Sequence, residues 1–418
     1  MRRFTPHWSL AVTGLAAATL AAAVPMAPAA ATPTTGLADQ VRATVLAERG
    51  PTVARQRGLT RIAAEPIVEP RRSEGSWAFG VATIPGAPDG HGAPDPSLYV
   101  ARRTAGRWQV AILGSPEFVA LARQAPASVV SADEKALFAA NHAAAAPTKA
   151  ATTGLAAAAL PADTGLALPF RKGTSAGMGG GPHDNNGSGS LYSSIDFGGT
   201  GTEIYSAGPG RIYRACVDAG SSATALILIV HPNGYVTGYY HLNQRTGFPA
   251  DGTQIGVEYY LGTAGTNTAC GGSANGAHVH FTLRSGNNTN PSFESVVGKT
   301  IGGWTFHSGG SNYTGPATHA DKKVVAGTSN DSVYNYGVYA GTGPYAGTVN
   351  ASGGANVRYN TSTSTSSVMY LAPSGRALSL SCRTTGSTVN NSNVWYRLTD
   401  ADYVAAALVS TTATVPAC

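Results

Sequence analysis

The sequence is poor in charge. Only 12% of its 418 residues are Asp, Glu, Lys or Arg, whereas Gly alone accounts for 52. This composition is typical of a secreted chain rich in strands and turns, and the length is too great for one ordinary domain. The formal net charge of +6 is misleading, because from residue 161 onward 13 Lys and Arg residues stand against 12 Asp and Glu residues. The charge therefore gives no reason to expect a nucleic-acid partner.

Long apolar runs are also scarce. Beyond residue 31 no segment has the roughly 18 continuous apolar residues that a membrane helix needs. The N-terminus differs, because Arg2 and Arg3 precede the run LAVTGLAAATLAAAVPM and the small-residue stretch APAAATP. This order is typical of a secretory signal peptide, predicted here over residues 1–31. The mature protein is therefore expected to be extracellular, with no membrane segment after the signal is removed.

Cysteine is rare, and all four cysteines lie in the second half of the chain. Four cysteines allow three pairings, and disulfides are common in exported proteins. Sequence proximity favours one bridge per domain, and the alternative is a set of free buried thiols. The expected pairs are Cys216–Cys270 and Cys382–Cys418.

Composition shifts predict several domains. Residues 32–160 end in the Ala-rich stretch AAAAPTKAATTGLAAAALPADTG and are interpreted as a pro-segment of mixed structure with a cleavable linker. The alternative is a permanent N-terminal domain. Residues 161–308 form the main predicted domain, and 309–345 are a Gly-, Ser- and Asn-rich linker. Residues 346–418 carry short strands at regular spacing, which indicates a small β-barrel.

Strand signals dominate the main domain. ALILIV at 225–230 is a continuous apolar run, as in a strand that is buried on both faces. It leads through HPNGY into VTGYYHL, and Asn233-Gly234 between two such runs is a strong hairpin signal. The predicted fold class is all-β, with antiparallel sheets.

The stretch GAHVHFTLR at 276–284 carries two histidines one residue apart. If it is a strand, His278 and His280 share one face with Thr282 and Arg284, and the apolar residues between them face the core. Two neighbouring imidazoles are best explained as neutral bases or metal ligands, although simple surface alternation also gives this pattern.

Further candidate ligands lie upstream. His183 occurs in a predicted Gly-rich loop, and Asp196 alternates with the apolar Ile195 and Phe197. Two imidazoles and one carboxylate are a common catalytic zinc set, which leaves a fourth position open for water. His241 ends the strand of the predicted hairpin. Spacing alone does not decide which of His278 and His280 is a metal ligand and which is a base, since such a pair can also supply two ligands.

The motifs GPHDNNGSGSLYSSIDFGG, YYHLNQ and GAHVHF together resemble the M23 family of zinc metallopeptidases, which includes the lysostaphin and LytM-like cell-wall enzymes. The similarity covers about residues 164–308 and is greatest to the β-lytic metalloendopeptidase and staphylolysin branch, whose members are secreted with a pro-segment. It implies a sheet-rich groove with one Zn²⁺ per chain held by His183, Asp196 and His280. It also implies that His278 is the general base and that His241 stabilises the transition state or shuttles protons.

Two aromatic residues are candidates for substrate binding. Tyr240 precedes His241 and is expected to line the groove, although adjacent tyrosines more often serve packing. Trp304 lies near the position where related enzymes place a substrate-binding tyrosine. Because a tryptophan has no phenol hydroxyl, it is expected to stack against substrate instead.

The C-terminal segment resembles a bacterial SH3 domain through its Val-Arg pair, its Trp-Tyr-Arg-Leu strand and YVAAALV, although the usual Gly-Pro is absent. The resemblance implies binding to the bacterial cell wall. Together the motifs predict a monomeric, secreted zinc endopeptidase, made as a zymogen, that cuts peptidoglycan peptides at glycyl or alanyl bonds. The alternatives are a catalytically silent wall-binding protein of the LytM type and a zinc carboxypeptidase or amidase acting on the same polymer.

Overall fold

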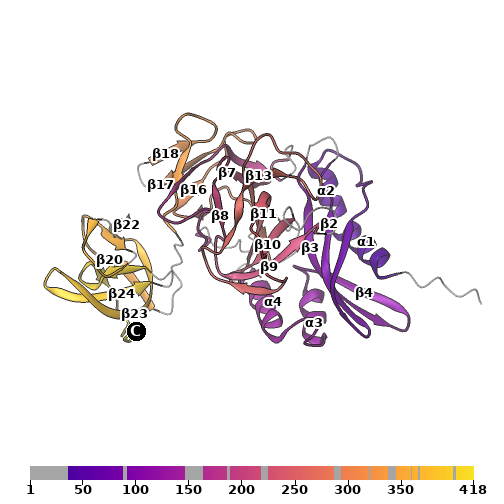
Figure 1. Ribbon diagram of the computed structural model, residues 1–418, viewed down its shortest axis with the longest axis horizontal. Coiled ribbons are helices and arrows are strands. Elements are labelled where there is room, and N and C mark those ends of the chain that lie inside the picture. Colours follow the sequence, from indigo (N-terminus) through magenta and orange to yellow (C-terminus); the bar gives the residue numbers. More distant parts are fainter. Residues whose placement is uncertain are drawn as a thin grey trace, which may run out of the picture. The chain divides into compact units, whose positions relative to one another are not determined.

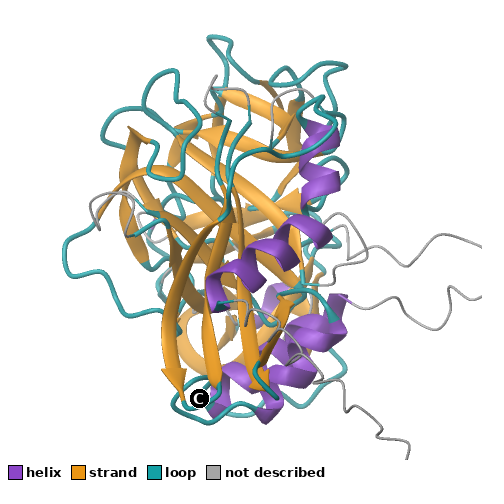
Figure 2. Cartoon of the chain, turned by 90° about the vertical axis from the view of Figure 1, so that its right-hand side faces the viewer, coloured by secondary structure: helices purple, strands orange, loops and turns teal. Residues whose placement is uncertain are grey.

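The structure of the chain is a computed structural model. It describes residues 36–418 except for gaps at 88–91, 146–162, 186–188, 218–224, 287–292, 320–321, 338–344, 359, 366–367 and 399–401. The predicted signal peptide and most of the Ala-rich linker, residues 146–162, lie outside the described residues. No helix in the part of the chain that the structure describes is long and apolar enough to cross a membrane. Strands predominate over helices in the described chain as a whole (Figure 2), which confirms the predicted fold class.

The N-terminal region has mixed structure, as predicted. Its strands form an antiparallel sheet in the order β1-β2-β3-β4. Alternate residues of β2 enter two different cores, since Ala78 and Ala82 pack with helix residues such as Val41, whereas Phe79 and Val81 face the opposite side. The elements of this region are α1 (Leu37–Glu48), α2 (Gly50–Gln56), β1 (Ile67–Glu74), β2 (Trp77–Ile84), β3 (Asp95–Thr104), β4 (Arg107–Ile112), α3 (Pro116–Gln124) and α4 (Ala132–Ala145).

The central region is built on one antiparallel sheet in the order β12-β9-β10-β11-β14-β7-β6, to which β13 and β8 are added through β11 (Figure 1). Its strands are β5 (Ser175–Gly177), β6 (Gly180–Asp184), β7 (Tyr192–Phe197), β8 (Glu203–Tyr205), β9 (Gly210–Ala215), β10 (Leu226–Val230), β11 (Tyr235–Gln244), β12 (Thr253–Ile255), β13 (Tyr260–Asn267) and β14 (Val279–Ser285).

The predicted hairpin is β10–β11. Four residues, 231–234, connect the strands, and a backbone bond from His231 N–H to Tyr235 O closes the turn. Gly234 has φ +91°, a backbone conformation that few other residues adopt. This explains why the Asn-Gly signal indicated the turn correctly.

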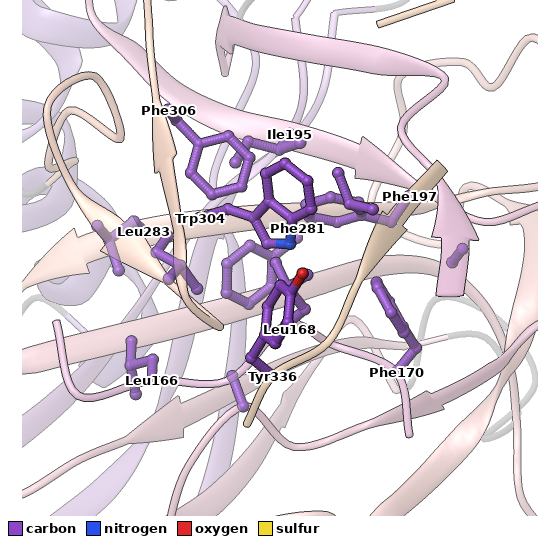
Figure 3. Close-up of a cluster of buried hydrophobic side chains, with 14 of the residues drawn as sticks. Leu166, Leu168, Phe170, Ile195, Phe197, Phe281, Leu283, Trp304, Phe306 and Tyr336 are labelled. Carbon is purple, nitrogen blue, oxygen red and sulfur yellow. The ribbon is translucent and has the colours of Figure 1, made fainter. Parts of the chain in front are cut away.

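Strand β10 is buried on both faces, as its apolar run predicted. Ile227 and Ile229 belong to the main core, which Figure 3 shows around Phe281, Trp304 and Phe306. Its other face contributes to a second core that is shared with the N-terminal region. That second core includes Leu226, Leu228 and Val230 from β10, Val236 and Tyr240 from β11, and Phe79, Val81, Phe118 and Phe138 from the N-terminal region.

Polar contacts accompany this shared core. The side-chain nitrogen of Asn141 donates to the carbonyl oxygens of His231 (2.6 Å) and Tyr235 (2.9 Å). The carboxylate of Asp95 is ion-paired with Arg284 on β14 at 2.8 Å. The N-terminal region therefore packs directly on the central sheet.

Part of the predicted linker at 309–345 forms short strands, which pair with strands of the preceding region. Strands β15 (Thr300–Ile301), β16 (Trp304–Phe306), β17 (Pro316–His319) and β18 (Lys322–Val325) form one antiparallel sheet, and β19 (Ser332–Tyr334) pairs with β5. These strands are very short and surrounded by Gly, Ser and Asn, so their sequence signal is weak. Their stability comes from pairing across long sequence separations.

The C-terminal region forms a separate curled sheet in the order β22-β21-β25-β24-β23-β20-β26. Its elements are β20 (Tyr345–Val349), β21 (Ala355–Arg358), β22 (Val368–Ala372), β23 (Ala377–Val389), β24 (Ser392–Leu398), β25 (Tyr403–Ala405), a 3₁₀ turn (Ala406–Leu408) and β26 (Val409–Ser410). It contains the Cys382–Cys418 disulfide.

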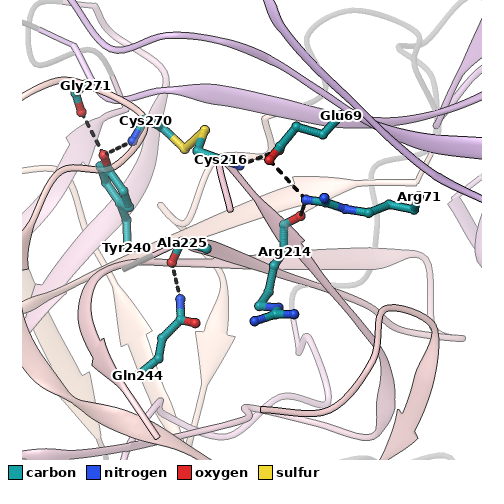
Figure 4. Close-up of a disulfide and its surroundings, with 9 residues drawn as sticks. All are labelled: Glu69, Arg71, Arg214, Cys216, Ala225, Tyr240, Gln244, Cys270 and Gly271. Carbon is teal, nitrogen blue, oxygen red and sulfur yellow. Dashed lines mark hydrogen bonds and ion pairs between the residues drawn. A yellow bond between two sulfur atoms is a disulfide. The ribbon is translucent and has the colours of Figure 1, made fainter. Parts of the chain in front are cut away.

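The second disulfide, Cys216–Cys270, joins the end of β9 to the segment that leads toward β14. Figure 4 shows its surroundings, where the Cys216 backbone N–H donates to Glu69 and the Cys270 N–H donates to the Tyr240 hydroxyl. Both pairings are those that sequence proximity favoured, and no described cysteine is free.

Candidate functional site

Three side chains from three strands of the central sheet converge at one point. His183 lies on β6, Asp196 on β7 and His280 on β14. His280 and Asp196 are direct partners in the β7–β14 ladder, which places their side chains on the same face at short range. The prediction of a loop around His183 was wrong, because this residue pairs with Ser194 within the sheet.

The atoms that meet are specific. His183 Nε2 lies 3.2 Å from His280 Nδ1, His280 Nδ1 lies 3.0 Å from Asp196 Oδ1, and His183 Nε2 lies 3.5 Å from the same oxygen. No other trio of His, Cys, Asp or Glu among the described residues is grouped closely enough to hold a metal ion. The three residues thus offer two imidazole nitrogens and one carboxylate oxygen to a common centre.

The outward ring nitrogens of both histidines are held by hydrogen bonds. His183 Nδ1 donates to the carbonyl oxygen of Gly181 at 2.8 Å, and His280 Nε2 donates to Oδ1 of Asn185 at 3.0 Å. The Gly181 carbonyl can only accept, so the His183 proton lies on Nδ1 and Nε2 keeps its lone pair. His280 faces an oxygen acceptor at each ring nitrogen, Asn185 Oδ1 at Nε2 and Asp196 Oδ1 at Nδ1, so its Nδ1 is free to bind a metal only when the proton lies on Nε2. Asn185 was not identified from the sequence.

Two further histidines lie beside this trio. The ring centroids of His241 and His278 are 4.8 Å apart, and His278 Nε2 is 3.7 Å from Asp196 Oδ1. His241 Nδ1 donates to Asn267 O at 2.8 Å, and His278 Nδ1 donates to Gly276 O at 2.9 Å. In both rings Nε2 is therefore the nitrogen that remains available to exchange a proton.

His241 has an unusual backbone conformation. Its φ is +70°, and the β11–β13 register shifts between His241 and Asn243. A left-handed conformation at a residue with a side chain costs energy, and irregularities of this kind re-aim side chains near active sites. Here the irregularity directly follows Tyr240, the last residue of β11 that pairs with β14.

The surroundings shift the pKa of three groups in this cluster, His183, His241 and Asp196. Burial lowers the pKa of His183 to about 4, against the opposing effect of Asp196. Burial, with His278 and His280 nearby, lowers the pKa of His241 to about 3. Burial alone raises the pKa of Asp196, but His183 and His280 outweigh it and hold that pKa well below its usual range. The carboxylate is therefore ionised while His183 and His241 are neutral.

The cluster opens into a cavity of about 760 Å³. Much of its wall is glycine, with two tyrosines and two residues of the N-terminal region. The lining residues are Gly92, Ala93, Gly179, Gly180, Asn185, Asp196, Gly198, Tyr240, His241, Gly272, Ser273, Asn275, Gly276, Ala277, His278, His280 and Tyr313. Six of these 17 residues are glycine, so parts of the wall carry no side chain.

Tyr313 is a second residue that sequence reasoning missed. Its ring stacks on that of His183, with centroids 4.1 Å apart and an interplanar angle of 23°, and it is 45% exposed. Burial of its hydroxyl, together with Asp196 and Asp184, raises its pKa to about 12. The residue lies in the predicted linker, and its only local signal is an aromatic ring within a Gly- and Ser-rich stretch.

The two predicted substrate-binding aromatics differ in position. Tyr240 lines the cavity, although its hydroxyl donates to Gly271 O and accepts from Cys270 N–H. Trp304 does not reach the cavity, because it is 1% exposed in the core and its Nε1 donates to Tyr334 O at 2.7 Å. The structure does not bring Trp304 to the predicted site, since the strand pairing of β16 turns its ring inward.

Comparison with known proteins places the chain in a family. Residues 191–291 match Peptidase family M23. The chain is 31% identical over 190 residues to beta-lytic metalloendopeptidase of Lysobacter enzymogenes, covering 43% of this chain and 97% of that protein. It is 34% identical over 170 residues to Protease LasA of Pseudomonas aeruginosa (strain UCBPP-PA14), covering 38% of this chain and 37% of LasA. The match therefore spans little more than a third of the length of that relative.

A solved structure of the M23 metalloprotease pseudoalterin is 26% identical, with a TM-score of 0.33, and covers 40% of this chain and 97% of that chain. The beta-lytic relative is matched over nearly its whole length, and the matched residues include Asp196, His278 and His280 within 191–291. The chain belongs to peptidase family M23.

Proposed function

We propose that this chain is a secreted zinc metalloendopeptidase that hydrolyses peptide bonds of bacterial peptidoglycan. The observation that carries the proposal is the convergence of His183 Nε2, Asp196 Oδ1 and His280 Nδ1 at separations of 3.0 to 3.5 Å. Membership of a peptidase family supports hydrolysis of peptide bonds as the reaction class.

The donor set fits a zinc ion. Zinc favours imidazole nitrogen and carboxylate oxygen, and three protein ligands leave a fourth position open. Metal binding requires deprotonated ligands, and His183 and Asp196 meet this requirement at neutral pH. We assign His183, Asp196 and His280 as the ligands of one Zn²⁺ per chain. A bound zinc ion supplies Lewis acidity, which lowers the pKa of water and polarises a carbonyl group.

His278 is proposed as the general base. Its Nδ1–H is held by Gly276 O, so Nε2 accepts the proton of the attacking water. The Nε2 atom lies 3.7 Å from Asp196 Oδ1, and this negative charge stabilises the imidazolium that forms. The proton is then available for the leaving amine, and no covalent intermediate with the protein is needed.

His241 is proposed as a proton shuttle. Its Nδ1–H is held by Asn267 O, so the neutral ring offers only a lone pair at Nε2. It must therefore first accept a proton before it can donate one to the substrate oxygen or nitrogen. Of the two roles considered for this residue, this geometry favours the shuttle over a permanent oxyanion donor.

The lining of the cavity favours a substrate with small residues on both sides of the cleaved bond. Gly180, Gly198 and Gly276 leave parts of its wall without side chains, which suits glycyl or alanyl bonds. We propose such bonds in peptidoglycan peptides as the substrate. The C-terminal region at 346–418 is proposed to be an SH3-like domain that tethers a monomeric enzyme to the wall and raises its local concentration there.

Synthesis as a zymogen is part of the proposal. Residues 1–31 would direct export, and residues 32–160 would restrict the site until they are removed. Gly92 and Ala93 of the N-terminal region line the cavity, which supports this role. If the full chain and the processed chain lysed purified walls at equal rates, the zymogen proposal would be wrong.

The decisive experiment combines zinc analysis with product analysis. The purified protein is expected to contain one zinc per chain, and purified peptidoglycan digested by it should release peptide fragments that mass spectrometry assigns to internal bonds. A His280→Ala variant should lose both zinc and hydrolysis. Zinc-free protein that still binds walls would support the silent wall-binding alternative, and release of terminal residues or sugar-free stems would support a carboxypeptidase or amidase.

A further inference from the structure

The two histidines of the metal trio use opposite ring nitrogens. His183 directs Nε2 inward and is held by a backbone carbonyl, that of Gly181. His280 directs Nδ1 inward and is held at Nε2 by a side chain, that of Asn185. His280 is therefore the ligand whose orientation depends on another residue's side chain, and that residue can be substituted.

We propose that Asn185 is a positioning residue that fixes the His280 ring for zinc binding. The inference rests on the proposed metal site and adds a residue to it. For Nδ1 of a neutral imidazole to bind a metal, Nε2 must carry the proton, so its partner must be an acceptor. Oδ1 of Asn185, 3.0 Å from Nε2, is such an acceptor. Asn185 is only 2% exposed, so water does not readily replace this bond.

The amide of Asn185 is itself oriented by the N-terminal region. An amide offers oxygen on one side and nitrogen on the other, and the two are easily exchanged by rotation. Here the side-chain Nδ2 lies 3.5 Å from the backbone carbonyl oxygen of Pro94. The backbone of Asn185 is held as well, because the backbone N–H of Ala93 donates to the backbone carbonyl oxygen of Asn185 at 2.9 Å. If the amide were flipped, its oxygen would face the carbonyl oxygen of Pro94 and its NH₂ group would face the N–H of His280. Only the observed orientation gives a donor and an acceptor at both contacts.

The test measures zinc affinity directly, by competition with a chromophoric chelator, on the full chain. Asn185→Leu keeps the approximate volume but removes the acceptor, and Asn185→Asp keeps an acceptor oxygen at the same distance from the backbone. We expect the Leu variant to bind zinc about 10- to 100-fold more weakly. The Asp variant should bind within a few-fold of the parent, although loss of the donor to Pro94 should lower its melting temperature.

A matched control separates zinc binding from general loss of a buried amide. Asn141 is a fully buried amide that bonds the carbonyl oxygens of His231 and Tyr235, away from the metal trio. Asn141→Ala should lower the melting temperature of the zinc-free protein and leave zinc affinity unchanged. If Asn185→Leu does not fold, Asn185→Ala takes its place, and the zinc-free melting temperature reports folding in each case.

Two results would overturn the inference. One is a folded Leu or Ala variant that binds zinc as tightly as the parent. The other is an Asp variant that loses as much affinity as the Leu variant, since that would make shape the requirement and not the acceptor. A parent protein that binds no zinc would instead reject the proposed function, so the two failures are distinguishable.

Discussion

Asp95 of the N-terminal region and Arg284 of β14 form a buried ion pair at 2.8 Å, in which both side chains are at most 6% exposed. Arg49 contacts the same carboxylate at 2.6 Å. Burial alone would raise the pKa of Asp95, but the two guanidinium groups outweigh it and lower that pKa. The carboxylate thus contributes stability only while it is ionised.

The ion pair predicts an acid-labile contact between the N-terminal region and the central sheet. A depressed pKa in the folded state contributes stability above the unfolded value of about 3.9 and loses it as the pH falls through the lower folded value. We expect Asp95→Asn to reduce the free energy of unfolding at pH 7 by about 3–5 kcal/mol, because two buried cations lose their partner. It should also reduce the difference between pH 7 and pH 3.

Denaturant titrations at both pH values measure this effect. Asp133→Asn is the control, since Asp133 pairs with Arg211 but its side chain is 80% exposed, and it should change stability by about 0.5 kcal/mol or less. Equal effects of the two substitutions would contradict the assignment of Asp95 as a structural ion.

Substitution of His278 should separate catalysis from metal binding. Because His278 is assigned as base and not as ligand, His278→Ala should retain one zinc per chain while hydrolysis of purified peptidoglycan falls about 10²–10⁴-fold. His183→Ala should instead lose zinc. Loss of zinc from the His278 variant, with zinc retained when His280 is replaced, would reverse the roles of the two residues.

We predict that the hydroxyl of Tyr313, a residue that lines the cavity, contacts substrate. Its ring stacks on His183 and it is exposed at the cavity, so Tyr313→Phe should preserve the stacking, the zinc content and the melting temperature. We expect kcat/KM for a soluble wall peptide to fall about tenfold or more, as when a donor to developing charge is removed. Unchanged kinetics would restrict Tyr313 to a packing role.

The Cys216–Cys270 disulfide should stabilise one wall of the cavity. It joins β9 to the segment that carries Gly272 and Gly276, and its two cysteines are 54 residues apart (Figure 4). Replacing both cysteines with serine should cost about 2–5 kcal/mol and reduce hydrolysis. The equivalent change at Cys382 and Cys418 should lower only the stability of the C-terminal region, which heat denaturation followed with limited proteolysis can resolve.

Alternation and ligand chemistry made much of the site predictable. The placement of Asp196 between Ile195 and Phe197 gave its orientation, because both neighbours enter the core and the carboxylate faces the other way. The hairpin at Gly234 and the double burial of β10 were also predictable, since turn geometry and continuous apolar runs are local signals.

The sequence does not reveal which distant residues cover each face of a strand. Thr282 and Arg284 share a face with the two histidines, as alternation predicts, yet both are buried, and Arg284 is paired with a residue almost 190 positions away. Tyr313 and Asn185 were missed for the same reason, because their roles depend on contacts that no local pattern encodes. Trp304 was misplaced because nearness in sequence to a family position did not specify which way its strand would turn.

The shared core around Phe79, Leu228 and Val236 has a bearing on maturation. The described members of this core, like the bonds from Asn141 and Asp95, join residues that precede 146 to residues that follow 162. A protease that cut the backbone anywhere in that interval would leave every one of them in place. If the chain is processed as proposed, the two polypeptides would then persist as one folded body, and release of the enzyme would require that the N-terminal region be digested or pulled away.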